Sequence, residues 1–149
     1  MRDYKKEYEE RVAFIRDLLE KSGAKGIVYG NSGGKDSALV GILCKAACDN
    51  TVGIIMPCAS KRNFGQDAED ARIAADQYGI ETRFIDLTPV REAEMRQLSA
   101  LTEVTPAAAV NIAPRLRMTT LYAVAASEGR LVAGTGNRSE AYVGYFTKW

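Results

Sequence analysis

Four short runs of strand-forming residues alternate with longer helical segments along this chain. The runs lie at residues 26–29, 51–56, 81–85 and 130–133, and helical patterns occupy residues 3–22, 38–46, 67–78, 88–100 and 114–128. Strands that alternate with helices form right-handed βαβ units in a parallel sheet. The 149 residues suit one domain. The sequence therefore predicts an α/β fold, an open parallel sheet with helices on both faces, in a single domain over residues 1–149.

Charge and residue content exclude several classes of function. Lys and Arg together number 20 and Asp and Glu 19, so no broad basic field exists to bind nucleic acid. No apolar run approaches the ~18 residues of a membrane span, and the charged N-terminus lacks the apolar core of a secretory signal. We expect a cytoplasmic protein with neither nucleic-acid nor membrane partners. Because histidine is absent, Ser–His–Asp and Cys–His catalysis within this chain are excluded.

The three cysteines, Cys44, Cys48 and Cys58, show no disulfide-framework spacing. Cys44 and Cys48 lie four residues apart on an expected helix, where a metal pair is conceivable. A zinc site would find no second cysteine pair and no histidine to complete it. We interpret the cysteines as buried free thiols of a reducing compartment.

The first expected strand runs directly into the glycine-rich turn Gly30-Asn-Ser-Gly-Gly-Lys-Asp-Ser37. Gly33 and Gly34 let backbone amides approach an oxyanion, and the following helix N-terminus adds positive potential. Ser32 and Ser37 add hydroxyl donors, whereas the Lys35 side chain could point to the anion or to solvent. A carboxylate at Asp36 would repel a phosphate unless a divalent cation lay between them. The alternative is a plain strand-to-helix turn in which Asp36 only favours the helix dipole.

A second such turn, Gly134-Thr-Gly-Asn-Arg-Ser-Glu140, follows the last expected strand. Thr135 offers a hydroxyl and Glu140 a carboxylate. Asn137 with Glu140 three residues on also fits a capping box, which alone would explain the glutamate. Both turns follow strands of one parallel sheet, so they should open on the same crevice. We therefore expect the carboxyl groups of Asp36 and Glu140 to lie close enough to share one cation.

The pattern Ser-Gly-Gly-x-Asp-Ser resembles the signature of the PP-loop ATP pyrophosphatases and differs from the Walker A pattern. Three further stretches make the chain similar to ammonia-dependent NAD synthetases within that superfamily. They are the second turn with Gly144-Tyr-Phe-Thr-Lys148, the segment Asn111-Ile-Ala-Pro-Arg-Leu-Arg-Met118 before Leu121-Tyr122, and Met56-Pro57 with Asp67-Ala68. The resemblance runs from the first helix to the last residue. It implies a Rossmann-like three-layer fold of the adenine nucleotide alpha hydrolase type.

Residue roles are carried over from this resemblance position by position. It implies that ATP is bound by Gly30, Asn31, Ser32, Gly33, Gly34, Lys35, Asp36, Ser37, Met56 and Thr135. Asp36 and Glu140 would hold Mg²⁺, and Arg115 and Lys148 would contact deamido-NAD. An arginine suits a dinucleotide pyrophosphate because its guanidinium is planar and always charged. From the residues alone, Arg115 could equally be a surface arginine, Lys148 a solvated lysine and Met56 a core residue. Arg117 is a weaker candidate for the duty of Arg115.

The resemblance implies ATP-dependent amidation of deamido-NAD to NAD with ammonia, in a homodimer. The nicotinate carboxylate would attack the α-phosphorus of ATP, pyrophosphate would leave, and ammonia would displace AMP from the adenylate. No protein nucleophile is needed, in agreement with a chain that lacks histidine. Two alternatives stay open: another adenylating PP-loop ligase such as a GMP synthetase-like enzyme, and a non-catalytic nucleotide-binding fragment.

Family members continue beyond the position of Trp149 with a Gly-Asp pair, a later lysine and a loop over the ATP phosphates. We therefore expect this chain to correspond to the N-terminal part of such an enzyme, truncated at its C-terminus. Tested alone, it should have an incomplete site and little or no synthetase activity.

Overall fold

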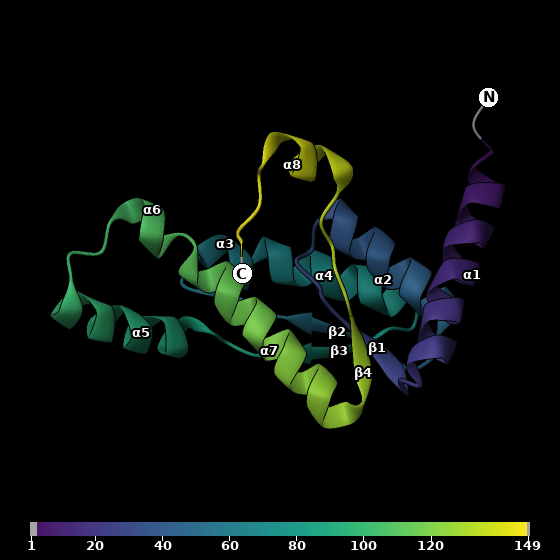
Figure 1. The fold of residues 1–149 in the computed structure, drawn as a ribbon, viewed down its shortest axis with the longest axis horizontal. Coiled ribbons are helices and arrows are strands. Elements are labelled where there is room, and N and C mark those ends of the chain that lie inside the picture. The colour runs from purple at the N-terminus through teal and green to yellow at the C-terminus, as the bar shows by residue number, and fades with distance from the viewer. Residues whose placement is uncertain (1–2, 149) are drawn as a thin grey trace.

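The computed structural model describes residues 3–148 and is built around one parallel sheet (Figure 1). Its strands are β1 (Gly26–Gly30), β2 (Thr51–Ile55), β3 (Glu81–Phe84) and β4 (Arg130–Ala133), in the order β3-β2-β1-β4. Val28 in β1 pairs with Val52 on one side and with Val132 on the other. The expected open parallel sheet is confirmed.

Helices cover both faces of the sheet (Figure 1). α2 (Lys35–Ala47) and α4 (Gln66–Gln77) pack on one face, and α1 (Tyr4–Ser22) packs against α2. α7 (Ile112–Glu128) crosses the other face in contact with β1 and β4, and α5 (Thr88–Leu101) contacts α7. The chain therefore moves outward from β1 to β3 and returns on the opposite face to place β4 beside β1. This reversal creates a crevice at the carboxyl ends of β1 and β4, where α/β sheets bind ligands.

Three short helices complete the described chain. α8 (Arg138–Val143) begins where the sequence predicted, directly after the second glycine-rich turn. α3 (Lys61–Phe64) and α6 (Pro106–Ala109) lie in segments for which no element was predicted. α2 and α7 begin three and two residues earlier than expected, at Lys35 and Ile112.

The core has two layers because successive side chains of β1 point to opposite faces of the sheet. Val28 packs with Val52 and Ile54 beneath α7. Tyr29 packs on the other face with Ala75 of α4. The phenol of Tyr29 needs the glycine at position 41 of α2, since a Cβ there would lie 2.3 Å from the tyrosine Oη. Burial raises the pKa of Tyr29 to about 12.

The three cysteines are free thiols. Cys44 and Cys58 are buried and Cys48 is half-buried. Burial, together with the nearby Cys48, raises the pKa of the Cys44 thiol to about 11. The prediction of free thiols is confirmed, and that of burial holds fully for Cys44 and Cys58.

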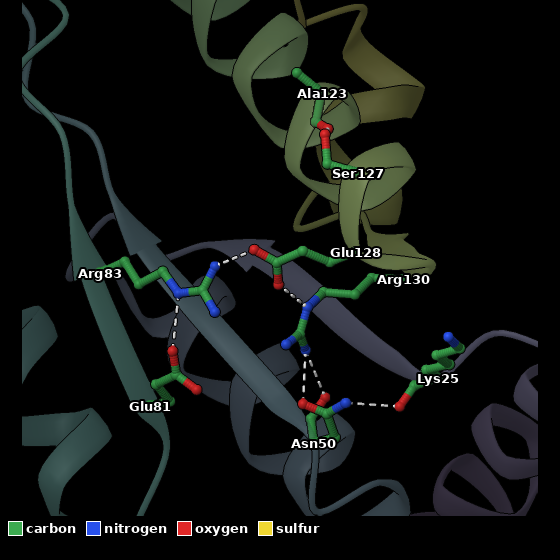
Figure 2. A network of polar contacts seen from close by, with 8 residues as sticks. All are labelled: Lys25, Asn50, Glu81, Arg83, Ala123, Ser127, Glu128 and Arg130. Atoms are coloured by element: carbon green, nitrogen blue, oxygen red, sulfur yellow. Dashed lines mark hydrogen bonds and ion pairs between the residues drawn. The ribbon is translucent and has the colours of Figure 1, made fainter.

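A polar network ties the amino ends of the strands together (Figure 2). Glu128, at the end of α7, lies between two arginines and accepts a hydrogen bond from Arg83 Nη1 of β3 and one of 2.6 Å from Arg130 Nε of β4. Arg130 Nη1 also donates to the carbonyl oxygen of Asn50 at 3.0 Å, and Asn50 Nδ2 donates to the carbonyl oxygen of Lys25 at 2.7 Å. The hydrogen bonds from Arg83 and then Arg130 lower the pKa of Glu128. The network fastens α7 and β4 to the sheet at the end opposite the crevice.

β4 lies at one edge of the sheet. Between this strand and the helices α1 and α2 lies an apolar hollow of about 360 Å³. Phe14 and Leu18 of α1 and Leu131 of β4 contribute to its lining. Phe14 is 61% exposed and Leu18 44% exposed. Among residues 3–148, no helix combines the length and the apolar character that a bilayer span requires.

Candidate functional site

The first glycine-rich turn joins the carboxyl end of β1 to the N-terminus of α2. The Ser32 N–H donates to Ser37 Oγ at 3.3 Å, and Ser37 Oγ donates to the Gly34 carbonyl oxygen at 2.9 Å. Ser37 is buried, so its hydroxyl braces the turn from inside. Gly34 occupies the N-cap position of α2, and no side chain caps this helix. The first-turn amides of α2 are therefore available to an anion.

Gly33 holds the turn against α4. Its φ of +78° lies in the left-handed region, and a Cβ at this position would lie 2.2 Å from the carbonyl oxygen of Asp67. Glycine is required on both counts, because an L side chain would meet backbone strain and a backbone clash together.

Asn31 also braces the turn. Its buried amide donates from Nδ2 to the Ala71 carbonyl oxygen of α4 at 2.9 Å, and its Oδ1 accepts from the Gly33 N–H at 3.4 Å. The neighbouring Lys35 side chain is exposed. The sequence predicted that Asn31 and Lys35 both bind ATP. In the structure, Asn31 also holds the turn against α4 through its hydrogen bond to Ala71.

The second turn joins β4 to α8 and meets the first. Asn137 and Glu140 form a capping box: Asn137 Oδ1 accepts from the Glu140 N–H at 2.9 Å, and Glu140 Oε2 accepts from the Asn137 N–H at 3.0 Å. Asn137 Nδ2 also donates to Asp36 Oδ2 at 3.2 Å. Two turns separated by 101 positions in the sequence are thereby joined through one side chain.

The carboxylates of Asp36 and Glu140 are both half-buried and both bonded to Asn137. Within residues 3–148, Asp36 Oδ1 and Glu140 Oε1 accept no hydrogen bond, so one oxygen of each is free to bind a ligand. The same range holds no cluster of three or more His, Cys, Asp or Glu residues suited to a metal. A cation here would have to take its remaining ligands from a substrate or from water.

Arg115 and Lys148, the residues predicted to contact the dinucleotide, lie together at the N-terminal part of α7. Arg115 Nε donates to the carbonyl oxygen of Lys148 at 3.1 Å, and Thr147 Oγ1 donates to Asn111 Oδ1 at 2.7 Å. Both predicted side chains are exposed. Arg115 thus holds the backbone of the segment that carries Lys148.

A cavity of about 720 Å³ opens between the turns at the carboxyl ends of the strands. Its lining includes seven of the predicted ATP-binding residues: Gly30, Asn31, Ser32, Gly33, Gly34, Met56 and Thr135. Lys35, Asp36, Ser37 and Glu140 do not line it, and neither do Arg115 and Lys148. Met56 is 6% exposed and belongs to the core cluster beneath α7, so it serves both the core and the cavity wall.

Arg117, which the sequence gave as a weaker candidate than Arg115, lies at the cavity. Its side chain lines the cavity, donates from Nε to the Met56 carbonyl oxygen at 2.9 Å, and donates from Nη2 to Asn63 Oδ1 at 3.2 Å. Asn63 Nδ2 in turn donates to Asp67 Oδ2 at 2.9 Å, and Arg62 Nε donates to Asp67 Oδ1 at 3.0 Å. These contacts build a polar wall from α3, α4 and α7 opposite the second turn.

Comparison with known proteins gives consistent matches over nearly the whole chain. A family model described as NAD synthase matches residues 7–149. An NH₃-dependent NAD⁺ synthetase of Carboxydothermus hydrogenoformans is 42% identical over 99% of this chain and 60% of its own length. The solved NMN synthetase of Francisella tularensis superposes with a TM-score of 0.90 at 33% identity, over 99% of this chain and 60% of that one.

The NH₃-dependent NAD synthetase of Campylobacter jejuni, solved with a nitrate ion, superposes with a TM-score of 0.87 at 35% identity. That match covers 99% of this chain and 62% of the solved one. The chain therefore spans about 60% of the length of these relatives. The family model covers all but the first six residues. On these grounds the chain belongs to the NAD synthase family.

Proposed function

We propose that this chain forms the ATP-binding part of an NAD synthetase, as one PP-loop ATP pyrophosphatase domain. The reaction is the amidation of deamido-NAD to NAD with ammonia, with ATP cleaved to AMP and pyrophosphate. The observation that carries the proposal is the junction of two glycine-rich turns through Asn137 and Asp36 at the carboxyl ends of adjacent strands. The cavity lined by Gly30 to Gly34 and by Thr135 supports the proposal, because ligands of parallel α/β sheets bind at the carboxyl ends of the strands.

The chemistry needs activation because an ionised carboxylate cannot expel oxide. The nicotinate carboxylate attacks the α-phosphorus of ATP, the bond from that phosphorus to the bridging oxygen breaks, and pyrophosphate leaves. Ammonia then attacks the carbonyl carbon of the adenylate, and AMP leaves with the former carboxylate oxygen. Both steps depend on positioning and on charge stabilisation, so the amides of α2 and the hydroxyls of Ser32 and Thr135 are suited to the work.

Asp36 and Glu140 are the residues of this chain that fit a magnesium ion. Each offers one free, half-buried carboxylate oxygen, and hard oxygen ligands are those that Mg²⁺ prefers. A bound Mg²⁺ would neutralise phosphate charge. Without it, the carboxylate of Asp36 beside the phosphate turn would repel ATP.

Arg115 and Lys148 remain our proposed contacts for deamido-NAD. Their side chains share one exposed region at the start of α7, outside the cavity lining, which suits the distal part of a long dinucleotide. The position of Arg117 in the cavity lining supports a contact with the nucleotide as its proposed role. A homodimer and a cytoplasmic location belong to the same proposal.

A second candidate substrate for the amidation is suggested by the likeness to an NMN synthetase, at a TM-score of 0.90. In that case the amidated substrate is the mononucleotide of nicotinate. The two acceptors share the reacting carboxylate and the ATP site, and differ only in the part remote from the chemistry.

The test begins with titration of ATP into the chain, with Mg²⁺ and with EDTA, in a calorimeter. We expect Mg²⁺-dependent binding that Asp36→Asn weakens by about tenfold or more with an unchanged melting temperature, because the substitution removes a charged metal ligand. Asp49→Asn, on an exposed residue at the amino end of the sheet, serves as the control. Failure of the unaltered chain to bind ATP, or equal binding by Asp36→Asn, would contradict the proposal.

Pyrophosphate release distinguishes the acceptors. With ATP, Mg²⁺ and ammonia present, release triggered by deamido-NAD supports an NAD synthetase, and release triggered only by nicotinate mononucleotide supports the second candidate. Because the 149 residues alone should have an incomplete site, this assay uses a form extended to the full length of the relatives. ATP binding without release by that form, under either condition, identifies a non-catalytic nucleotide-binding protein.

A further inference from the structure

The side chain and the backbone N–H of Asn137 make three hydrogen bonds, with two different purposes. Its Oδ1 and its backbone N–H complete the capping box with Glu140, which concerns α8 alone. Its Nδ2 donates to Asp36 Oδ2 at 3.2 Å, which concerns α2 and the first turn. The residue is half-buried, as are both of its carboxylate partners.

Capping does not explain an asparagine at this position. Serine, threonine and aspartate cap helices about as well, because the cap needs only a side-chain oxygen. Of these side chains, only asparagine combines that oxygen with an N–H donor that can meet a carboxylate. An aspartate would instead bring a third negative charge beside Asp36 and Glu140.

The bond to Asp36 also determines which oxygens remain available. Asn137 occupies Oδ2 of Asp36 through its amide and Oε2 of Glu140 through its backbone N–H. The free oxygens, Oδ1 and Oε1, are thus selected by contacts with one and the same residue. Asn137 therefore restricts the orientation of both carboxylate groups.

We propose that Asn137 is a positioning residue, whose side-chain amide locks the second turn onto the first and holds Asp36 and Glu140 in register for a common cation. The inference rests on the proposed function, in that the cation is the magnesium of ATP. Asn137 itself touches neither ATP nor the metal in this role.

Asn137→Ser separates the two purposes of the side chain, since serine keeps the cap and loses the donor to Asp36. We expect it to retain the melting temperature and to weaken Mg²⁺-dependent ATP binding by about tenfold, the scale of a hydrogen bond to a charged group. Mn²⁺ bound with ATP should show an altered electron paramagnetic resonance spectrum. Ser139→Ala, at an exposed position of α8 two residues from Asn137, should change neither measurement.

Wild-type affinity in Asn137→Ser, beside a weakened Asp36→Asn, would overturn the positioning role and leave the proposed function intact. Absence of any Mg²⁺ effect in both variants and in the parent chain would instead contradict the proposed function.

A second experiment needs no ligand. Hydrogen exchange of the α8 amides should accelerate by about fivefold in Asp36→Ala, although Asp36 is 101 positions away from Asn137, because the turn loses its anchor. Asn137→Ser should give a similar acceleration, and the double variant should be no faster than either single one, as for two partners of one bond. Unchanged exchange in α8 of Asp36→Ala, or additive effects in the double variant, would refute the link between the turns.

Discussion

Gly33 is the residue of the first turn with the least freedom to change. Gly33→Ala should lower the free energy of unfolding by about 1–3 kcal/mol, since it adds left-handed strain to the clash with the Asp67 carbonyl. The substitution should also weaken ATP binding by about tenfold or more, because the turn must move away from α4 to accept the methyl group. Thermal denaturation and calorimetric titration measure the two effects.

The adjacent Gly34 supplies a matched control. Its φ is −82°, and a Cβ there would lie 3.4 Å from Ser32 Oγ, an ordinary contact distance. Gly34→Ala should therefore leave the melting temperature nearly unchanged. Equal destabilisation by both substitutions would mean that the close contact between α4 and the turn is not the reason why position 33 requires glycine.

The sequence indicated which turns would meet, but not which side chains of α7 would face the cavity. The expected meeting of the two turns is seen in the hydrogen bond from Asn137 to Asp36, since strand ends in a parallel sheet are fixed by the fold. The sequence could not tell which arginine of α7 lines the cavity. Arg115 and Arg117 are two positions apart and so point about 200° apart around the helix, and only the packing of α7 decides between them.

Asn31 shows a second limit at the scale of a residue. The sequence suggested Asn31 as an ATP ligand but gave no sign of its structural role, in which the side chain is 3% exposed and donates to the Ala71 carbonyl oxygen. The partner is forty residues away, so no local pattern in the sequence announces it.

At the scale of the elements, Glu128 joins the end of α7 to two strands, and its depressed pKa makes this junction sensitive to acid. A lowered folded pKa means that the contribution of Glu128 is fully present above its ordinary pKa of 4.5 and is lost as the pH falls through the folded value. Glu128→Gln should be less stable than the parent chain at pH 7, and the difference should shrink towards zero in strong acid.

Denaturant titrations followed by circular dichroism between pH 2 and 7, a range of about five units around the glutamate pKa, measure this difference. Glu94→Gln, on the exposed side of α5 and outside the network, is the control and should follow the parent chain throughout. A stability difference that stays constant with pH would show that the Glu128 carboxylate is not the acid-sensitive group.

The sequence predicted every strand and the longer helices, but not the two four-residue helices α3 and α6. The four strands and five longer helices carry either β-rich runs or helical periodicity over several turns. α3 and α6 have four residues each, about one turn, so no periodicity can develop in them. Their helical form depends on position between longer elements and on the Thr105 side chain, which accepts from the Ala108 N–H at the start of α6.

At the scale of the whole molecule, the edge of β4 and the hollow beside it leave apolar surface uncovered. Phe14 and Leu18 line this hollow and are exposed, next to an edge strand with backbone groups available for pairing. Surfaces of this kind promote association. We expect the purified 149-residue chain to self-associate at micromolar concentration, and Phe14→Lys with Leu18→Lys to shift it towards monomer in light scattering coupled to size exclusion.

Leu101→Lys controls for added charge alone. Leu101 is 81% exposed at the end of α5, away from β4, so its substitution should leave the association unchanged. Loss of association in this control as well would mean that net charge, and not the exposed apolar hollow beside β4, governs the association.

The pairing of β1 with β4 has a consequence for how the protein is made. These neighbours are about a hundred residues apart in the chain, so a growing polypeptide can form β1, β2 and β3 long before β4 emerges from the ribosome. During that interval the first turn exists without the second, and Asp36 has no Asn137 to meet. The two glycine-rich turns can meet only after nearly all of these 149 residues have been synthesised.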